Sequence, residues 1–162
     1  MTKMIPIVIT ILSCKGKYLF IQRKNPPYEG LWSMVGGKVN IGEHIHTAAI
    51  REVQEETGAL EVMGYNYRGI VSERLVDAEG SLQSHFLIFV GHASISDFSK
   101  NHREGELVLF SLGEIKTRKD AFLPSDYEMF HRFLSKNPES SVHEVELLRS
   151  DKGYHLVYYR VP

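Results

Sequence analysis

The chain has one cysteine, Cys14, so an internal disulfide is excluded. Cys14 lies in an apolar run, and we expect it to be a small core residue and not a nucleophile. No apolar stretch reaches the roughly 18 residues that a membrane-spanning helix needs. Nor does charge of one sign dominate, because 19 basic and 20 acidic residues leave a formal net charge of −1. The sequence therefore lacks the overall basic field that binds a nucleic-acid polymer or an anionic membrane.

These absences favour a single domain over residues 1–162 in a reducing compartment. A chain of this length can bury a substantial core. The first residues, MTKMIPIVITIL, contain one lysine and a short apolar run but no small-residue cleavage site. We expect this segment to form a strand and not a signal peptide, and a cytoplasmic location fits these features.

The stretch from Gly36 to Ala59, GGKVNIGEHIHTAAIREVQEETGA, carries most of the chemistry. Glu52, Glu55 and Glu56 are spaced i, i+3 and i+4, which places them on one face of an α-helix. Like charges at this spacing repel, so a fold that gathers them usually has a cation there. Carboxylate oxygens at this density suit Mg²⁺, with Mn²⁺ as a substitute. The stretch therefore predicts a site for a hard divalent cation.

Apolar residues in the same stretch predict how the helix packs. Ile45, Ala49 and Val53 recur every four positions and form a stripe to be buried. Gly58 follows the last periodic residues and is expected to end the helix. A glycine-rich loop precedes the helix and permits close approach of the backbone. We expect the carbonyls of this loop to face the acidic side of the helix.

The spacing of these residues resembles the signature of the Nudix hydrolases. Gly37 is followed after five residues by Glu43 and after seven more by the run REVQEETG, residues 51–58. Every charged and glycine position of the signature is present. Two positions depart from it: Ala59 stands at the final aliphatic site, and Val35 stands where many members have proline. The resemblance covers about residues 5–135 and implies an α/β fold, with a mixed β-sheet between helices in an α/β/α sandwich.

The resemblance also implies roles for individual residues. The implied catalytic residues that bind the metal are Glu52, Glu55 and Glu56. The implied metal ligands are these three carboxylates and the loop carbonyl of Gly37. Glu43 and Arg51 would pair and fix the loop to the helix, although Glu43 also suits the positive end of a helix dipole.

Candidate substrate-binding residues are Arg23, Lys38 and Asp126. At the positions of Arg23 and Lys38, family members commonly direct basic side chains toward the phosphates, where an arginine gains bidentate hydrogen bonds. Two solvated basic side chains are the alternative. Asp126 follows Leu123-Pro124-Ser125, where oxidised-purine triphosphate diphosphatases of the family carry a base-reading asparagine or aspartate. The alternative for Asp126 is an acid near the positive end of a helix.

The general base that orients or deprotonates water is left open. One candidate is Glu52. The other is an acid of the loop over residues 94–106, where family members often supply a further glutamate. Within that loop Glu106 is preferred and Glu104 competes, and a solvated loop acid is the alternative for each.

Outside the acidic stretch the patterns mostly predict strands. Strand-like runs cover residues 5–12, 18–22, 61–76, 85–93 and 107–110. The first two are expected to form a hairpin, the third to be one long bent strand or two, and the fourth to be central in the sheet. Residues 94–105 are expected to form a loop.

Two short helices and a final hairpin complete the predicted elements. Ser111 is expected to cap a helix over residues 112–116, with Glu114 at its third position, and Ser125 to cap a helix over residues 126–135. Runs at 142–149 and 154–161 flank a turn and predict a hairpin over about 142–161. This hairpin looks like an addition to a core of about 5–135, and would extend a sheet edge or form a homodimer contact.

The leading functional hypothesis is a Mg²⁺-dependent hydrolase that cleaves the diphosphate linkage of a nucleoside diphosphate linked to X. Within it, house-cleaning of nucleoside triphosphates, including oxidised purines of the 8-oxo-dGTP type, ranks above ADP-ribose or a nucleotide sugar. The alternative is a nucleotide-binding regulator without turnover, against which the complete set of carboxylates argues. A third hypothesis, an adaptor that uses the final hairpin as a contact surface, is compatible with catalysis.

Overall fold

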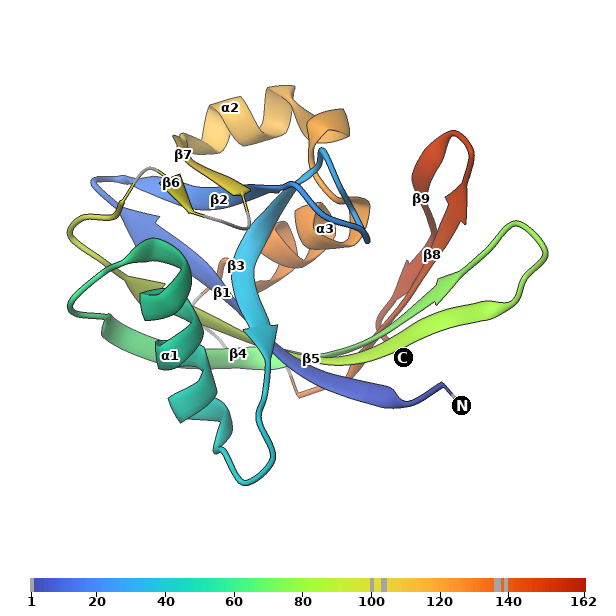
Figure 1. Ribbon diagram of the computed structural model, residues 1–162, viewed down its shortest axis with the longest axis horizontal. Helices are drawn as coiled ribbons and strands as arrows, with labels where there is room; N and C mark the ends of the chain where they lie inside the picture. Colours follow the sequence, from blue (N-terminus) through green and yellow to red (C-terminus); the bar gives the residue numbers. More distant parts are fainter. Residues whose placement is uncertain (1, 100, 103–104, 136–137, 139) are drawn as a thin grey trace.

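The computed structural model describes residues 2–99, 101–102, 105–135, 138 and 140–162. Within these residues, nine strands form one curled sheet in the order β6-β7-β2-β3-β1-β5-β4-β8-β9 (Figure 1). The strands are β1 (Met4–Cys14), β2 (Lys17–Arg23), β3 (Trp32–Lys38), β4 (Met63–Val76), β5 (Leu82–Ser94), β6 (Asn101–His102), β7 (Gly105–Phe110), β8 (His143–Ser150) and β9 (Gly153–Arg160). The helices are α1 (Ile45–Thr57), α2 (Leu112–Thr117) and α3 (Pro124–Phe133), with a short 3-10 turn, η1 (Lys119–Ala121).

Helices cover both faces of the sheet, and β1 shows how the core is divided between them. Successive side chains of a strand point to opposite faces. Ile9 and Ile11 join a core cluster that contains residues of α2 and α3, whereas Val8 and Leu12 lie in clusters that contain residues of α1. The sheet is mixed, because β1 runs parallel to β5 and β4 parallel to β8 while the other pairs are antiparallel. The predicted α/β fold with a mixed sheet between helices is confirmed.

The predicted hairpin of the first two strands is correct only at its turn. β1 and β2 pair through Ser13 with Tyr18 and Cys14 with Lys17, and then β3 lies between them. The twist of the sheet opens the hairpin, so β3 supplies backbone partners to both strands. Cys14 is buried, as expected.

Residues 63–76 form one strand, which settles the choice between one strand and two. Register shifts against β5 bend it near Tyr67 and Leu75. β5 lies inside the sheet between β1 and β4, as expected for its apolar sequence. The expected loop over 94–105 contains the two-residue strand β6, and part of it falls outside the described residues.

Helix α1 follows its predicted pattern closely. Ala49 and Val53 are buried together with Ala48, whereas Ile45 is only partly buried. Gly58 ends the helix with φ of 71°, a left-handed conformation that favours glycine. Ala59, the departure from the family signature, is buried in the core.

The two shorter helices differ in how well their starts were predicted. The Ser111 hydroxyl accepts a hydrogen bond of 3.1 Å from the Glu114 N–H, which confirms the expected cap of α2. The expected cap at Ser125 is wrong, because α3 already begins at Pro124 with Leu123 as its N-cap residue. Proline suits the first helical position since its missing N–H would have no partner there. Ser125 is instead buried in the first turn.

The C-terminal hairpin, β8–β9, is confirmed and extends the sheet. β8 runs parallel to β4, with Val71 opposite His143 and Val76 opposite Leu148. Val145 and Leu147 are buried, so the hairpin contributes to the main core. No helix among the described parts of the chain is long and apolar enough to cross a membrane.

Candidate active site

A cavity of about 580 Å³ opens on the face of the sheet that α3 covers. Its apolar wall comes from β1 and β5, and its charged groups come from α1, β4, the start of α3 and the ends of β2 and β3. The charged residues that line it are Arg23, Lys38, Glu52, Glu56, Glu73 and Asp126. Five of these six were identified from the sequence, and the chain brings them together from segments that are far apart.

The acidic row of α1 consists of Glu52, Glu55 and Glu56, and two glycines of β3 let Glu52 and Glu56 reach this cavity. The Gly36 N–H donates to Glu56 Oε2 at 3.2 Å. A Cβ atom on Gly37 would lie 2.4 Å from Glu52 Cδ, so only glycine tolerates this approach of strand to carboxylate. Glu52 and Glu56 therefore stand at the cavity wall, although the body of α1 packs on the opposite face of the sheet.

Arg51 holds the acidic row and the preceding loop in place. Its Nε and Nη2 donate to the two carboxylate oxygens of Glu43 at 2.7 and 2.9 Å, and Nη1 donates to Glu52 Oε1 at 2.8 Å. Nη2 also donates to the Lys38 carbonyl at 3.0 Å. The Arg51 hydrogen bonds and the Asn40 N–H hold the pKa of Glu43 down at about 2. The loop, the end of β3 and the helix are thus tied by one guanidinium.

Glu55 lies apart from the other two carboxylates of the row. Its carboxylate accepts from Arg51 Nη1 at 3.1 Å, and its side chain is 59% exposed. It does not line the cavity, in contrast to Glu52 and Glu56. In this arrangement two of the three predicted metal carboxylates face the space in which a substrate fits.

The donor set fits a partly hydrated Mg²⁺ ion. Within the described residues, no group of three Asp, Glu, His or Cys side chains forms a ready-made metal cage. Mg²⁺ seldom needs one, because it keeps several waters and is bound by one or two carboxylates together with substrate phosphates. Glu52 and Glu56 supply two such carboxylates, and Gly37 lies directly beside Glu52.

The two basic side chains lie at the strand ends beside the cavity. Arg23 ends β2, and its Nε donates to the Pro27 carbonyl at 3.1 Å. Lys38 ends β3 with an exposed side chain. Both line the cavity that Glu52 and Glu56 line. Lys38 lies beside the acidic helix, where its carbonyl accepts from Arg51, and Arg23 lies at the other end of β3, beside Leu31 and near Asp126.

Asp126 binds the middle of β3, two residues before Gly36, whose N–H binds Glu56. It is only 6% exposed, and its Oδ2 accepts a hydrogen bond of 2.8 Å from the Met34 N–H. Burial raises its pKa to about 6, against the opposing effects of the Met34 bond and the charge of Arg23. Three residues of strand, about 10 Å, separate Met34 from Gly37. Asp126 and Glu52 thus line the same cavity, on the two sides of this short stretch of β3.

Glu73 lines the cavity but was not among the residues predicted from the sequence. This residue lies in the second half of β4 and is only 2% exposed. Burial is the main cause that raises its pKa to about 7, and the negative charge of Asp126 adds to the effect. A signal was present: Val71 and Leu75 alternate with Glu73 and are buried, so Glu73 shares their face of the strand.

Of the two loop candidates for the general base, the structure describes only Glu106. Glu106 lies on β7 opposite Gln22, is exposed, and does not line the cavity. Glu104 lies outside the described residues. Glu52 thus lines the cavity, whereas Glu106 lies on the strand next to that of Arg23 and does not line it.

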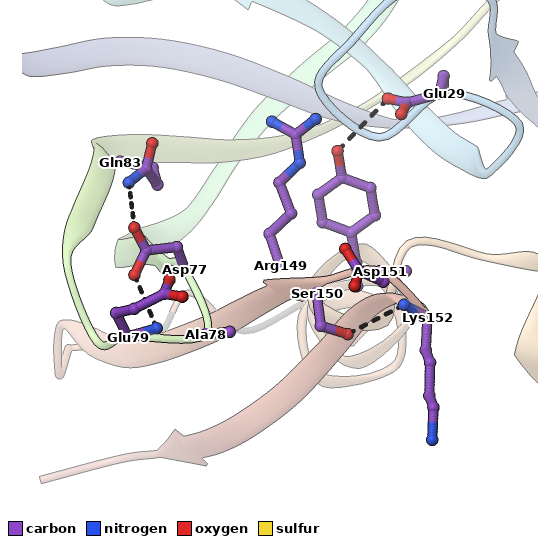
Figure 2. Close-up of a pocket in the computed structure, with 11 residues that line it drawn as sticks. Glu29, Asp77, Ala78, Glu79, Gln83, Arg149, Ser150, Asp151 and Lys152 are labelled. Atoms are coloured by element: carbon purple, nitrogen blue, oxygen red, sulfur yellow. Dashed lines mark hydrogen bonds between the residues drawn. The ribbon is translucent and has the colours of Figure 1, made fainter.

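A second hollow lies between the β4–β5 turn and the β8–β9 turn (Figure 2). Its polar groups bind one another: Asp77 accepts from the Glu79 N–H and the Gln83 amide, and the Tyr154 hydroxyl donates to Glu29. These bonds stabilise the turns and the loop before β3. The hollow contains none of Glu52, Glu55 and Glu56, so the cavity that Glu52 and Glu56 line is the candidate site.

Comparison with known proteins agrees with this geometry. The chain is 35% identical over 95 residues to the CTP pyrophosphohydrolase of Escherichia coli, which covers 51% of this chain and 70% of that protein. It is 42% identical over 50 residues to the ADP-ribose pyrophosphatase of Methanocaldococcus jannaschii, which covers 31% of this chain and 30% of that protein. This second match thus spans less than a third of either protein.

A solved structure extends the similarity to the whole fold. The mutator MutT protein from Bacillus halodurans superposes with a TM-score of 0.76 over 97% of both chains, at 24% identity. The superposition therefore includes nearly all of the C-terminal segment that follows residue 133. The family model of the NUDIX domain matches residues 2–133, which include the acidic helix, both basic strand ends and Asp126. The chain belongs to the NUDIX family.

Proposed function

We propose that the protein is a Mg²⁺-dependent pyrophosphohydrolase that cleaves the diphosphate linkage of a nucleoside diphosphate linked to X. One observation carries the proposal: Glu52, Glu56, Arg23 and Lys38 line a single cavity together with an apolar wall. Carboxylates for a cation, basic groups for phosphates and an apolar surface for a base are the parts that such a substrate requires.

The residues of the chain have distinct parts in the proposed reaction. Glu52 and Glu56 would hold a Mg²⁺ ion, or Mn²⁺ in its place, which would neutralise phosphate charge and lower the pKa of a bound water. Glu52 is the proposed base, because it lines the cavity and is 13% exposed in a position fixed by Arg51. It accepts a proton from the attacking water while an oxygen–phosphorus bond forms and the bond to the leaving phosphate breaks. Arg23 and Lys38 bind and orient the phosphates.

The preferred substrate is a nucleoside triphosphate, in which X is a further phosphate. Among the triphosphates, those of purines, including oxidised purines, rank first. The relative that is matched over 70% of its length is named for CTP, a nucleoside triphosphate. Asp126 supports a base contact because it is buried and lines the cavity. ADP-ribose or a nucleotide sugar is the second candidate, favoured by the shorter match to a protein named for ADP-ribose. A regulator without turnover is disfavoured, since Glu52, Glu55 and Glu56 are all present.

The experiment is a panel of nucleotides incubated with Mg²⁺, with the products resolved by chromatography. A nucleoside monophosphate and pyrophosphate from a triphosphate is the expected result. AMP and a sugar phosphate from ADP-ribose or an ADP-sugar alone would replace the first candidate by the second. Binding of nucleotides without any product, under conditions in which the folded protein is intact, would overturn the proposal.

A further inference from the structure

Glu73 is a buried acid in a position that otherwise suits an apolar residue. It shares one face of β4 with Val71 and Leu75, and it lies opposite Phe86 of β5 and Val145 of β8. Burying a carboxyl group in such surroundings is unfavourable unless it is hydrogen-bonded. The position therefore needs a reason other than the packing of the core.

The protein itself satisfies Glu73 only in part. The Tyr28 hydroxyl donates to Oε2 at 3.5 Å, the limit of a hydrogen bond. Among the described residues, neither Oε1 nor the Ser125 hydroxyl has a hydrogen-bond partner of good geometry, and the hydrogen-bonding contact by which Ser125 lowers the pKa of Glu73 is therefore a strained one. An unpaired buried oxygen that lines a cavity is a place for a donor from a bound molecule.

The surroundings define what that donor belongs to. Glu73 and Asp126 line the same cavity, and one oxygen of Asp126 already accepts from the Met34 N–H. The wall around them is apolar, with Ile9, Phe86 and Ile88 among its residues. Two carboxyl groups beside flat apolar surface complement an aromatic ring with neighbouring N–H donors. They disfavour an edge that presents ring nitrogen or carbonyl acceptors.

We propose that Glu73 is a specificity-determining residue that, with Asp126, binds the N–H groups on the edge of a guanine-type base. Guanine presents N1–H beside its 2-amino group, so two acceptors meet adjacent donors. Adenine presents one amino group beside the N1 acceptor and matches less well. This inference rests on the proposed function and adds to it the class of base and the residue that selects it.

The test compares kcat/KM for dGTP and dATP in the wild type and in two variants that lack the carboxyl group. Glu73→Leu and Glu73→Met keep similar volume and continue the apolar face of β4, and replacing buried charged groups in this way is often neutral for stability. The wild type is expected to favour dGTP, and each folded variant to lose that preference by about tenfold or more, the usual effect of leaving a hydrogen-bonding edge unpaired. Glu144→Gln, on the surface of β8, is the matched control and should retain the preference.

The outcomes separate this inference from the proposed function. Loss of the dGTP preference in a variant that melts cooperatively supports the role of Glu73. Equal losses on dGTP and dATP, or a wild type that hydrolyses both equally well, would overturn it and leave the proposed hydrolysis intact. A wild type that hydrolyses no nucleoside triphosphate would instead overturn the substrate class itself.

Discussion

At the scale of single residues, the site depends as much on missing side chains as on charged ones. Gly36 and Gly37 have no Cβ between β3 and the acidic row, so Glu56 accepts from the Gly36 N–H and Glu52 approaches Gly37. The sequence predicted close approach of the backbone at these glycines, and the family resemblance implied a metal-ligand role for Gly37. The structure adds the steric reason, a distance of 2.4 Å between a Cβ on Gly37 and Glu52 Cδ.

We expect Gly37→Ala to lower kcat by about tenfold or more, because the new methyl group displaces the Glu52 carboxylate and misplacement of a catalytic group is costly. Initial rates on the best substrate measure the effect. Gly113→Ala in α2 is the matched control, since its added Cβ would meet only the Ser111 hydroxyl, at 4.0 Å. Full activity of Gly37→Ala would show that the position of Glu52 is unimportant.

The choice of base gives a second prediction for single residues. Glu52→Gln should lower kcat by a factor on the order of 10² or more, because it removes a proposed metal ligand together with the base. Glu106→Gln should cost clearly less, since Glu106 is exposed on β7 and does not line the cavity. Steady-state kinetics of the two variants decide the order. A larger loss for Glu106→Gln would place the base in the loop.

At the scale of elements, the sequence predicted the periodic segments well, but it predicted less well which strands are adjacent in the sheet. The acidic helix, its end at Gly58 and the C-terminal hairpin followed from local spacing. The insertion of β3 between β1 and β2 did not, because strand order depends on contacts between distant segments. Glu73 was missed for a similar reason: a single glutamate within a strand pattern becomes informative only when its face is known to line a cavity.

Asp126 links two elements, and this gives a prediction about stability. Asp126→Ala leaves the Met34 N–H of β3 without its acceptor, so we expect a loss of about 1–3 kcal/mol in the free energy of unfolding. Asp126→Asn keeps an oxygen that can accept this bond and should lose less. Denaturant unfolding at fixed pH compares the two. Equal stability of the wild type and Asp126→Ala would mean that the bond does not contribute.

At the scale of the whole molecule, two buried carboxyl groups make stability depend on pH. Folding raises the pKa of Glu73 from 4.5 to about 7 and that of Asp126 from 3.8 to about 6, mainly by burial. The folded state therefore binds protons more tightly than the unfolded state. Stability falls as pH rises between about 4 and 7, and the loss is complete above the folded pKa values.

Glu73→Gln removes one of these titrations without changing the size of the side chain. The wild type loses stability through Glu73 as pH rises from 5.5 to 8, and the variant does not. The unfolding free energy of the variant minus that of the wild type should therefore increase by on the order of 2 kcal/mol between these two pH values. Urea denaturation at the two pH values measures this difference. A constant difference between variant and wild type at both pH values would contradict a raised pKa for Glu73.

The central claim is that Glu52 and Glu56 hold a divalent cation at which a diphosphate linkage is hydrolysed. The most direct measurement is the initial rate of nucleoside triphosphate hydrolysis, followed by product chromatography, as Mg²⁺ is titrated into protein freed of metal by a chelator. We predict no turnover in excess chelator and recovery with Mg²⁺ or Mn²⁺, with a much smaller recovery for Glu56→Gln. Full turnover in excess chelator would contradict the claim.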